Sequence, residues 1–251
     1  MSATEDVMEY ALQLYTVKDF VEFDMDYTFS RLQEFGYTGV EFGSFYSYTP
    51  EEINALLEKY NFKVLGAHVS IKQLEDEFES YLAFNRAIGN KNIVISGAET
   101  YDYEHMRDAI DRLKALKPRV EAEGFDFHYH THDLDHKRNK KTGIVPFDVL
   151  VNECDINLEL DTYWEYMAGI DPVEQMKRFK DRVKLIHVKD GDENRNPKYL
   201  GLGCAPVEAI VRYTVASGLP VIVESEGFTP DGITEAKRCA KYLKKLYPPQ
   251  E

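Results

Sequence analysis

The segment Phe127–Asp133, with the sequence FHYHTHD, contains three of the seven histidines in the chain. His128, His130 and His132 alternate with other residues, so in a β-strand their side chains would lie on one face. Imidazole is a poor filler for an apolar core, but it binds metals and exchanges protons near neutral pH. The row therefore predicts a site at the end of a strand. Structural histidines that hydrogen-bond to neighbouring strands would have the same spacing.

Other short apolar runs also end on, or contain near their end, side chains that could bind a metal or a polar substrate. These side chains belong to Gln13, Glu41, His68, Asp161, His187 and Glu224. Each has an ordinary alternative explanation, such as a helix cap for Asp161 or a solvated loop for Glu224. As a set, imidazole and carboxylate without thiolate predict a site for one divalent ion, either Mn²⁺, Mg²⁺, Co²⁺ or Zn²⁺.

The elements that must position these side chains are eight strand-like runs. They cover Tyr10–Leu14, Gly39–Phe42, Lys63–Val69, Asn92–Ser96, Asp126–His130, Ile156–Leu160, Val183–Val188 and Pro220–Glu224. Each run has four to seven residues and is rich in β-branched or aromatic side chains, which favours strands. Eight strands that alternate with helices in 251 residues predict one α/β domain over residues 1–251, a single (β/α)₈ TIM barrel. In such a barrel the carboxyl ends of the strands meet at one mouth.

Helical spacing separates the strand-like runs. The expected helices are Asp26–Phe35, a helix capped by Thr49, Gln73–Ile88, Tyr103–Ala122, Val145–Val151, Pro172–Phe179, Pro206–Ala216 and Asp231–Leu246. Thr49 is followed by proline and two glutamates, which is typical of a helix N-terminus. Pro118 lies inside one of these segments and predicts a kink or a break there.

Composition excludes several classes of protein. A formal net charge of −14 argues against binding to a nucleic-acid backbone, which needs a basic surface. The three cysteines are widely spaced and favour a reducing compartment over a disulfide framework. The acidic N-terminal segment has no apolar core, so we expect no secretory signal and a cytoplasmic location. No apolar run approaches the length of a membrane span.

Seven short motifs carry a resemblance along nearly the whole chain. They are Leu12–Asp19, Gly36–Glu41, Tyr129–Asp133, Leu160–Trp164, His187–Asp190, Gly201–Gly203 and Val223–Glu224. In this order the chain resembles the xylose-isomerase-like TIM barrels, often called sugar phosphate isomerase/epimerases. The resemblance implies that Asp161, His187 and Glu224 bind one divalent metal. Many relatives place a glutamate at the end of strand five as the fourth ligand, where this chain has His130.

The substitution at His130 bears on the expected reaction, which is proton abstraction next to the carbonyl of a keto-sugar or polyol. Ketose epimerases of this family use two metal-bound glutamates on opposite faces of the substrate. Here only Glu224 remains of that pair. An isomerase or epimerase is therefore expected, with a lyase as the alternative. Such a lyase would eliminate from a keto-inositol or cleave a 3-keto-glycoside or C-glycoside.

Further residues at the strand ends receive expected roles. Glu224 would transfer the proton, and His132, Lys189 or water would supply an acid. Lys189 would also contact substrate oxygens. Gln13, Glu41, His68 and Trp164 would contact the substrate. The two long loops His132–Pro146 and Lys189–Ala205 would lie at the mouth as lids or partner surfaces.

Two other functions fit the same barrel. An endonuclease IV-like nuclease would also use histidine and glutamate ligands, although the acidic charge opposes it. A non-catalytic or partner-dependent subunit would explain the unusual residue at position 130. The chain would act alone, as a homo-oligomer or as a hetero-subunit, and the sequence does not choose between these.

Overall fold

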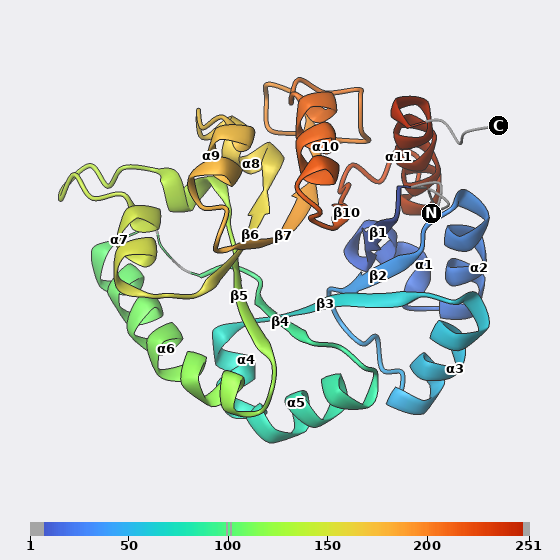
Figure 1. Ribbon diagram of the computed structural model, residues 1–251, viewed down its shortest axis with the longest axis horizontal. Coiled ribbons are helices and arrows are strands. Elements are labelled where there is room, and N and C mark those ends of the chain that lie inside the picture. The colour runs from blue at the N-terminus through green and yellow to red at the C-terminus, as the bar shows by residue number, and fades with distance from the viewer. Residues whose placement is uncertain (1–7, 99, 101, 248–251) are drawn as a thin grey trace, which may run out of the picture.

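Eight parallel strands close into a barrel in the computed structural model, which describes residues 8–98, 100 and 102–247 (Figure 1). Around the barrel the order is β1, β2, β3, β4, β5, β6, β7 and β10. The strands are β1 (Tyr10–Gln13), β2 (Gly39–Phe42), β3 (Lys63–Val69), β4 (Asn92–Ile95), β5 (Asp126–His130), β6 (Asn157–Asp161), β7 (Val183–Val188) and β10 (Val221–Val223). The predicted TIM barrel is confirmed, and every predicted strand is present.

Helices surround the barrel on its outer side (Figure 1). They are η1 (Leu14–Val17), α1 (Lys18–Val21), α2 (Met25–Phe35), α3 (Pro50–Tyr60), α4 (Ile71–Asp76), α5 (Phe78–Ala87), α6 (Tyr103–Ala122), η2 (Asp133–His136), α7 (Pro146–Glu153), α8 (Thr162–Met167), α9 (Pro172–Arg178), α10 (Val207–Ala216) and α11 (Gly232–Leu246). A short hairpin of β8 (Asp190–Gly191) and β9 (Pro197–Lys198) follows β7.

Most helix boundaries agree with the sequence. Thr49 caps α3 as expected: its hydroxyl accepts from the amide of Glu52, and the Glu52 carboxylate accepts from the amide of Thr49. Three details differ. The segment predicted as one helix over Gln73–Ile88 is divided at Glu77 into α4 and α5. The short helices η1, α1, η2 and α8 and the β8–β9 hairpin were not predicted. A kink or a break was expected at Pro118, and helix α6 continues through this residue without a break.

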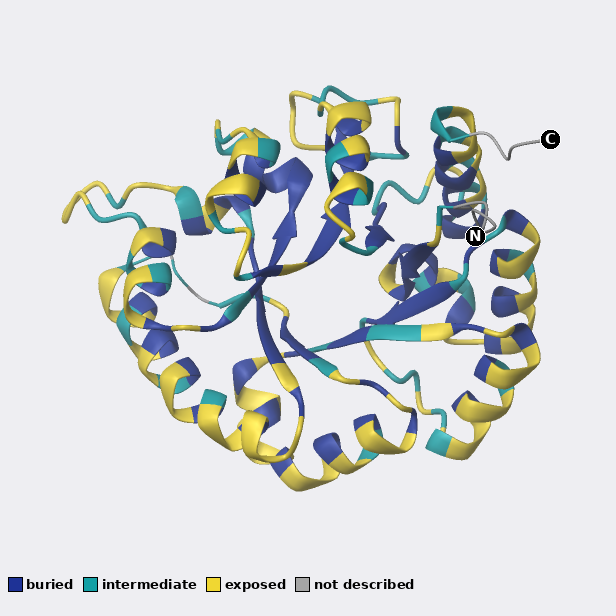
Figure 2. Cartoon of the chain, in the orientation of Figure 1, coloured by how far each residue is buried: buried dark blue, intermediate teal, exposed yellow. Residues whose placement is uncertain are grey.

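The core has an outer shell and a small inner layer. Two large clusters of buried apolar side chains fill the space between the strands and the helices, and the helices expose only their outward faces (Figure 2). A separate cluster of Ala11, Val94, Leu185 and Ile222 packs with Leu65. Because strand side chains alternate, residues two positions further along share this inner face. The polar side chains at the strand ends therefore lie directly above an apolar layer in the barrel interior.

None of the helices in the described part of the chain has both the length and the apolar character needed to cross a bilayer.

Arg182 fastens the start of β6, the strand that carries Asp161. Its guanidinium donates to the carbonyl oxygens of Val151 (2.8 Å), Cys154 (2.7 Å) and Ile156 (2.9 Å from Nε). These carbonyls lie at the end of α7 and in the turn before β6, so one side chain ties the helix to the strand.

We expect Arg182→Met to lower the free energy of unfolding by about 2–3 kcal/mol, because part-buried carbonyls lose a charged donor. Urea unfolding followed by circular dichroism measures this change. Lys180→Met removes an exposed cation two residues away and should change stability by less than about 0.5 kcal/mol. Equal effects of the two substitutions would contradict the fastening role.

Candidate active site

His187, at the end of β7, lies between two groups of ionisable side chains. Its Nε2 is 2.5 Å from Oε2 of Glu41 and 3.5 Å from Oε2 of Glu159. Its Nδ1 is 3.4 Å from Oε2 of Glu224. The imidazole is fully buried. The ring therefore has one nitrogen directed toward each group.

The first group, which we call the inner set, consists of His68, His130, Glu159 and Nε2 of His187. Oε2 of Glu159 lies 2.9 Å from Nε2 of His68 and 2.9 Å from Nδ1 of His130. The rings of His68 and His187 stack at 5.4 Å with an interplanar angle of 10°. One ligand atom from each of the four residues lies within 4.8 Å of all the others.

The second group, which we call the outer set, consists of Asp161, Glu224 and Nδ1 of His187. Their ligand atoms also lie within 4.8 Å of one another. The buried ammonium of Lys189 is 2.8 Å from Oε2 of Glu224 and 3.4 Å from Oδ2 of Asp161, and it also pairs with Glu226. A permanent cation thus accompanies the outer set.

Asp161 meets two demands with its two oxygens. Oδ1 caps α8 by accepting from the amides of Tyr163 and Trp164, both at 3.1 Å. Oδ2 is buried and accepts no hydrogen bond from the described residues, although Lys189 lies at ion-pair distance. The helix cap that the sequence offered as an alternative is therefore real, and it leaves one oxygen for another partner.

Glu41 is buried beside the inner set and held by its neighbours. It accepts from Nε2 of Gln13 at 2.8 Å, and Nε2 of His68 lies 3.2 Å from the same Oε2. Gly66 makes room for this carboxylate, because a Cβ at position 66 would lie 2.6 Å from Oε1 of Glu41. Gln13 and Glu41, which were expected to contact substrate, are both almost completely buried.

The rim of the mouth carries a smaller assembly. Nδ1 of His132 lies 2.6 Å from Oδ1 of Asp133, and its ring packs on Trp164 with the centroids 4.4 Å apart. Arg195, from the β8–β9 loop, pairs with Asp133 and lies over the Trp164 ring at 5.2 Å. The carboxylate fixes Nδ1 of His132 as the protonated nitrogen, so a neutral ring keeps its lone pair on Nε2.

The three histidines of the FHYHTHD segment thus have three different environments. His128 lies below the site, with Nε2 3.0 Å from Oδ1 of Asn92, and burial lowers its pKa to about 4. This is the structural alternative considered for the row. His130 belongs to the inner set, and His132 lies beyond the strand at the rim.

Burial and neighbouring charges shift the pKa values of side chains in both sets. Burial disfavours a charged His68, but the carboxylates of Glu41 and Glu159 outweigh it and raise the pKa of His68 to about 10. Burial lowers the pKa of His130, and the neighbouring His187 adds to that effect. Burial would raise the pKa of Glu224, but Lys189 and then His187 hold it well below its usual range.

Both sets fit the ligand chemistry of a divalent cation. Imidazole nitrogens and carboxylate oxygens are ordinary ligands for Zn²⁺, Mn²⁺ or Co²⁺. Among the described residues, four buried carboxylates have one oxygen without a hydrogen-bond donor: Asp161 of the outer set, Glu159 of the inner set, and Glu41 and Glu165, which belong to neither set. Such atoms are costly to bury unless a further partner satisfies them.

Of the residues predicted from the sequence, the structure brings His68, His130, Asp161, His187, Lys189 and Glu224 to the barrel mouth. Glu159 lies among them and was missed. The sequence offered a signal, because Glu159 is two residues before Asp161 in the same strand and must share its face. That His130 ligates the same ion as Asp161 and Glu224 stays a prediction, although the described residues group His130 with the inner set and not with these two carboxylates.

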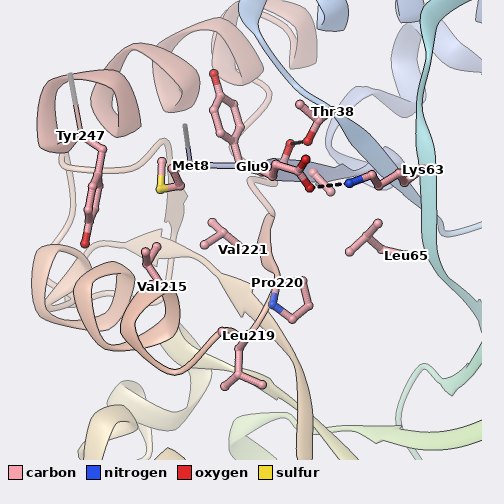
Figure 3. Close-up of a pocket in the computed structure, with 13 residues that line it drawn as sticks. Met8, Glu9, Thr38, Lys63, Leu65, Val215, Leu219, Pro220, Val221 and Tyr247 are labelled. Carbon is pink, nitrogen blue, oxygen red and sulfur yellow. Dashed lines mark hydrogen bonds and ion pairs between the residues drawn. The ribbon is translucent and has the colours of Figure 1, made fainter. Parts of the chain in front are cut away.

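A cavity lies at the opposite end of the barrel, away from these side chains. It has a volume of about 590 Å³ and is bordered by the starts of β1, β3 and β10 (Figure 3). Met8, Leu65, Val215, Leu219 and Tyr247 line it, and Glu9 pairs with Lys63 at its edge. It has none of the convergent groups of the mouth, so the chemistry belongs to the mouth.

Comparisons with known proteins agree with this fold. A family model described as xylose isomerase-like TIM barrel matches residues 29–246, which confirms the resemblance predicted from the sequence. An inosose dehydratase of Geobacillus kaustophilus (strain HTA426) is 24% identical over 196 residues, 67% of this chain and 62% of that protein. The chain thus matches less than two thirds of that relative's length.

Two solved structures have the same fold. A sugar phosphate isomerase/epimerase from Parabacteroides distasonis ATCC 8503 has a TM-score of 0.85 at 21% identity, with 97% of this chain and 100% of that chain covered. The IolI protein with a bound zinc atom has a TM-score of 0.74 at 14% identity, with 95% and 98% covered.

The contact between Gly66 and Glu41 yields a stability prediction. We expect Gly66→Ala to lower the free energy of unfolding by about 1–3 kcal/mol, because the added methyl group must displace a buried carboxylate. In a Glu41→Ala background the same substitution should cost less than about 1 kcal/mol, since the obstructing atom is gone. Urea unfolding of the four proteins measures the coupling, and purely additive effects would contradict it.

Proposed function

Because the chain belongs to the xylose isomerase-like TIM barrel family, we propose that it is a metal-dependent enzyme of carbohydrate metabolism. It removes a proton next to the carbonyl of a keto-sugar or keto-polyol. The observation that carries this proposal is the outer set, in which Asp161, His187 and Glu224 converge beside the buried Lys189. The inosose dehydratase and sugar isomerase/epimerase names of its relatives support the substrate class.

Asp161, His187 and Glu224 would hold one divalent ion. Three protein ligands with an open position are typical of a catalytic metal site rather than a structural one. The zinc atom in the IolI structure supports a metal in this fold. When bound, the ion would polarise the substrate carbonyl and stabilise the charge that develops on its oxygen.

Glu224 is the proposed base. Lys189 lies 2.8 Å from its Oε2 and keeps the carboxylate ionised, as a base requires. The same ammonium lies 5.3 Å from the centroid of Trp164, whose ring can pack against the apolar face of a sugar. Lys189 and Trp164 would therefore orient the substrate. His68, which was expected to contact substrate, lies against Glu41 and Glu159, so it would act with the buried Gln13 and Glu41 by holding His187.

We favour elimination over epimerisation as the outcome. Epimerisation needs a second proton-transfer group on the far face of the substrate. His130, the candidate by sequence position, is buried, and its Nδ1 lies 2.9 Å from Glu159. Elimination needs one base and one acid, and His132 would be the acid in its protonated form, with Nδ1 donating to Asp133 and Nε2–H directed to the leaving group. The dehydratase name of the curated relative supports the same direction.

The proposal is tested by incubating the Mn²⁺-loaded protein with an inosose and with 3-keto-glucosides in D₂O. We expect loss of water or of the glycosidic leaving group in one of these substrates. Solvent deuterium should enter at the carbon beside the carbonyl where proton return competes. Mass spectrometry and proton NMR measure both. A wild-type protein that exchanges no proton with any keto-sugar would contradict the proposed function.

The assignment of the base has its own test. Glu224→Gln keeps the shape of the side chain but removes its basicity, so turnover should fall at least about 10²-fold while metal content is retained. Glu208→Gln on the exposed face of α10 is the control and should leave turnover unchanged. Normal turnover of metal-loaded Glu224→Gln would assign the base elsewhere.

A further inference from the structure

The inner set has a geometry of its own, separate from the outer set. His68, His130 and Glu159 contribute atoms to the inner set alone, and they come from β3, β5 and β6. Two donors bound to one ion at about 2.1 Å lie roughly 3–3.5 Å apart. The atoms around Oε2 of Glu159 lie at 2.9, 2.9 and 3.5 Å from it, as ligands of one ion would.

The distribution of charge in the barrel mouth also favours a cation at the inner set. Among the described residues, Lys189 contacts the carboxylates of Asp161, Glu224 and Glu226, all on the Nδ1 side of His187. On the Nε2 side, the buried carboxylates of Glu41 and Glu159 face imidazoles. Because Lys189 lies on the other side, the positive charge that compensates this pair comes from protonated imidazoles or from a bound cation that takes the place of their protons.

We propose that the inner set binds a second divalent cation of the Zn²⁺ type. His68, His130, Glu159 and Nε2 of His187 supply the four ligands. Because Nδ1 of His187 faces the outer set, the ring would bridge the two ions as an imidazolate, with its proton released to solvent. Imidazole nitrogens with one carboxylate suit Zn²⁺, whereas the more acidic outer set suits Mn²⁺ or Mg²⁺ equally well. The second site does not depend on the reaction proposed above.

Four protein ligands make the inner site closed, so its ion does not bind substrate. The inner ion would affect the reaction only by positioning side chains of the outer set. It would fix the orientation of the His187 ring, whose Nδ1 faces Glu224 at 3.4 Å. Groups that orient a metal-binding histidine commonly change the affinity of its ion by about 10–100-fold. Loss of the inner ion should therefore weaken the outer site without abolishing it.

The test measures bound zinc per chain after chelator treatment and reloading with Zn²⁺, by mass spectrometry of the metal. We expect two ions in the wild type. One ion should remain in Glu159→Gln and in His130→Gln, both of which lose the inner site, and one in Asp161→Asn, which loses the outer site. Glu165→Gln alters a buried carboxylate outside both sets and should keep two ions. Circular dichroism verifies that each variant is folded.

The outcomes separate the two proposals. Two ions retained in both Glu159→Gln and His130→Gln would overturn the inner site. A single wild-type ion that survives Glu159→Gln but not Asp161→Asn would also overturn it and leave the proposed function intact. A single ion lost in Glu159→Gln and kept in Asp161→Asn would support the inner site and overturn the ligand set of the proposed function.

Discussion

The concentration of buried negative charge around His187 is the constraint on which the rest of this structure depends. Glu41, Glu159, Asp161 and Glu224 all lie within the barrel, where water cannot solvate them. Lys189 compensates one side of the cluster. Proteins bury carboxylates in this way when cations or donors offset the lost hydration, and arrangements of this kind are concentrated at functional sites.

The parallel barrel can bury these carboxylates because its hydrophobic core does not depend on the residues of the mouth. Its strands are buried on both faces, and an apolar layer of Ala11, Val94, Leu185 and Ile222 closes the interior beneath the charges. The outward faces pack against the helices, so the hydrophobic core is complete without the mouth. Polar residues can therefore occupy the strand ends without dividing the core.

Much of this arrangement could be predicted from the sequence. Short β-branched runs separated by helical spacing predict all eight strands, and the polar residues at the ends of most runs account for most of the site. Glu159 was not predicted because Asp161, the last polar residue of the same run, stands closer to the strand end. The pairing of β6 with β7 also shifts between Leu158 and Glu159, and a similar shift precedes Glu41. Such irregularities redirect side chains and have no signature in a single sequence.

The different environments of the three histidines could not be predicted from the sequence either. His128, His130 and His132 have the same spacing, yet one is structural, one lies in the inner set and one is at the rim. The difference comes from partners distant in sequence: Asn92 for the first, Glu159 for the second and Trp164 for the third. A strand pattern specifies which face a side chain occupies but not which neighbours it meets there.

The most direct test of the central claim is the free energy of unfolding measured in chelator and again in saturating Mn²⁺ or Zn²⁺. Cations that bind only the folded barrel should stabilise it, by about 2.7 kcal/mol at a concentration one hundred times the dissociation constant. The buried carboxylates would then have their missing partners. Equal stability in chelator and in either metal would contradict the claim that this barrel is built to hold divalent cations.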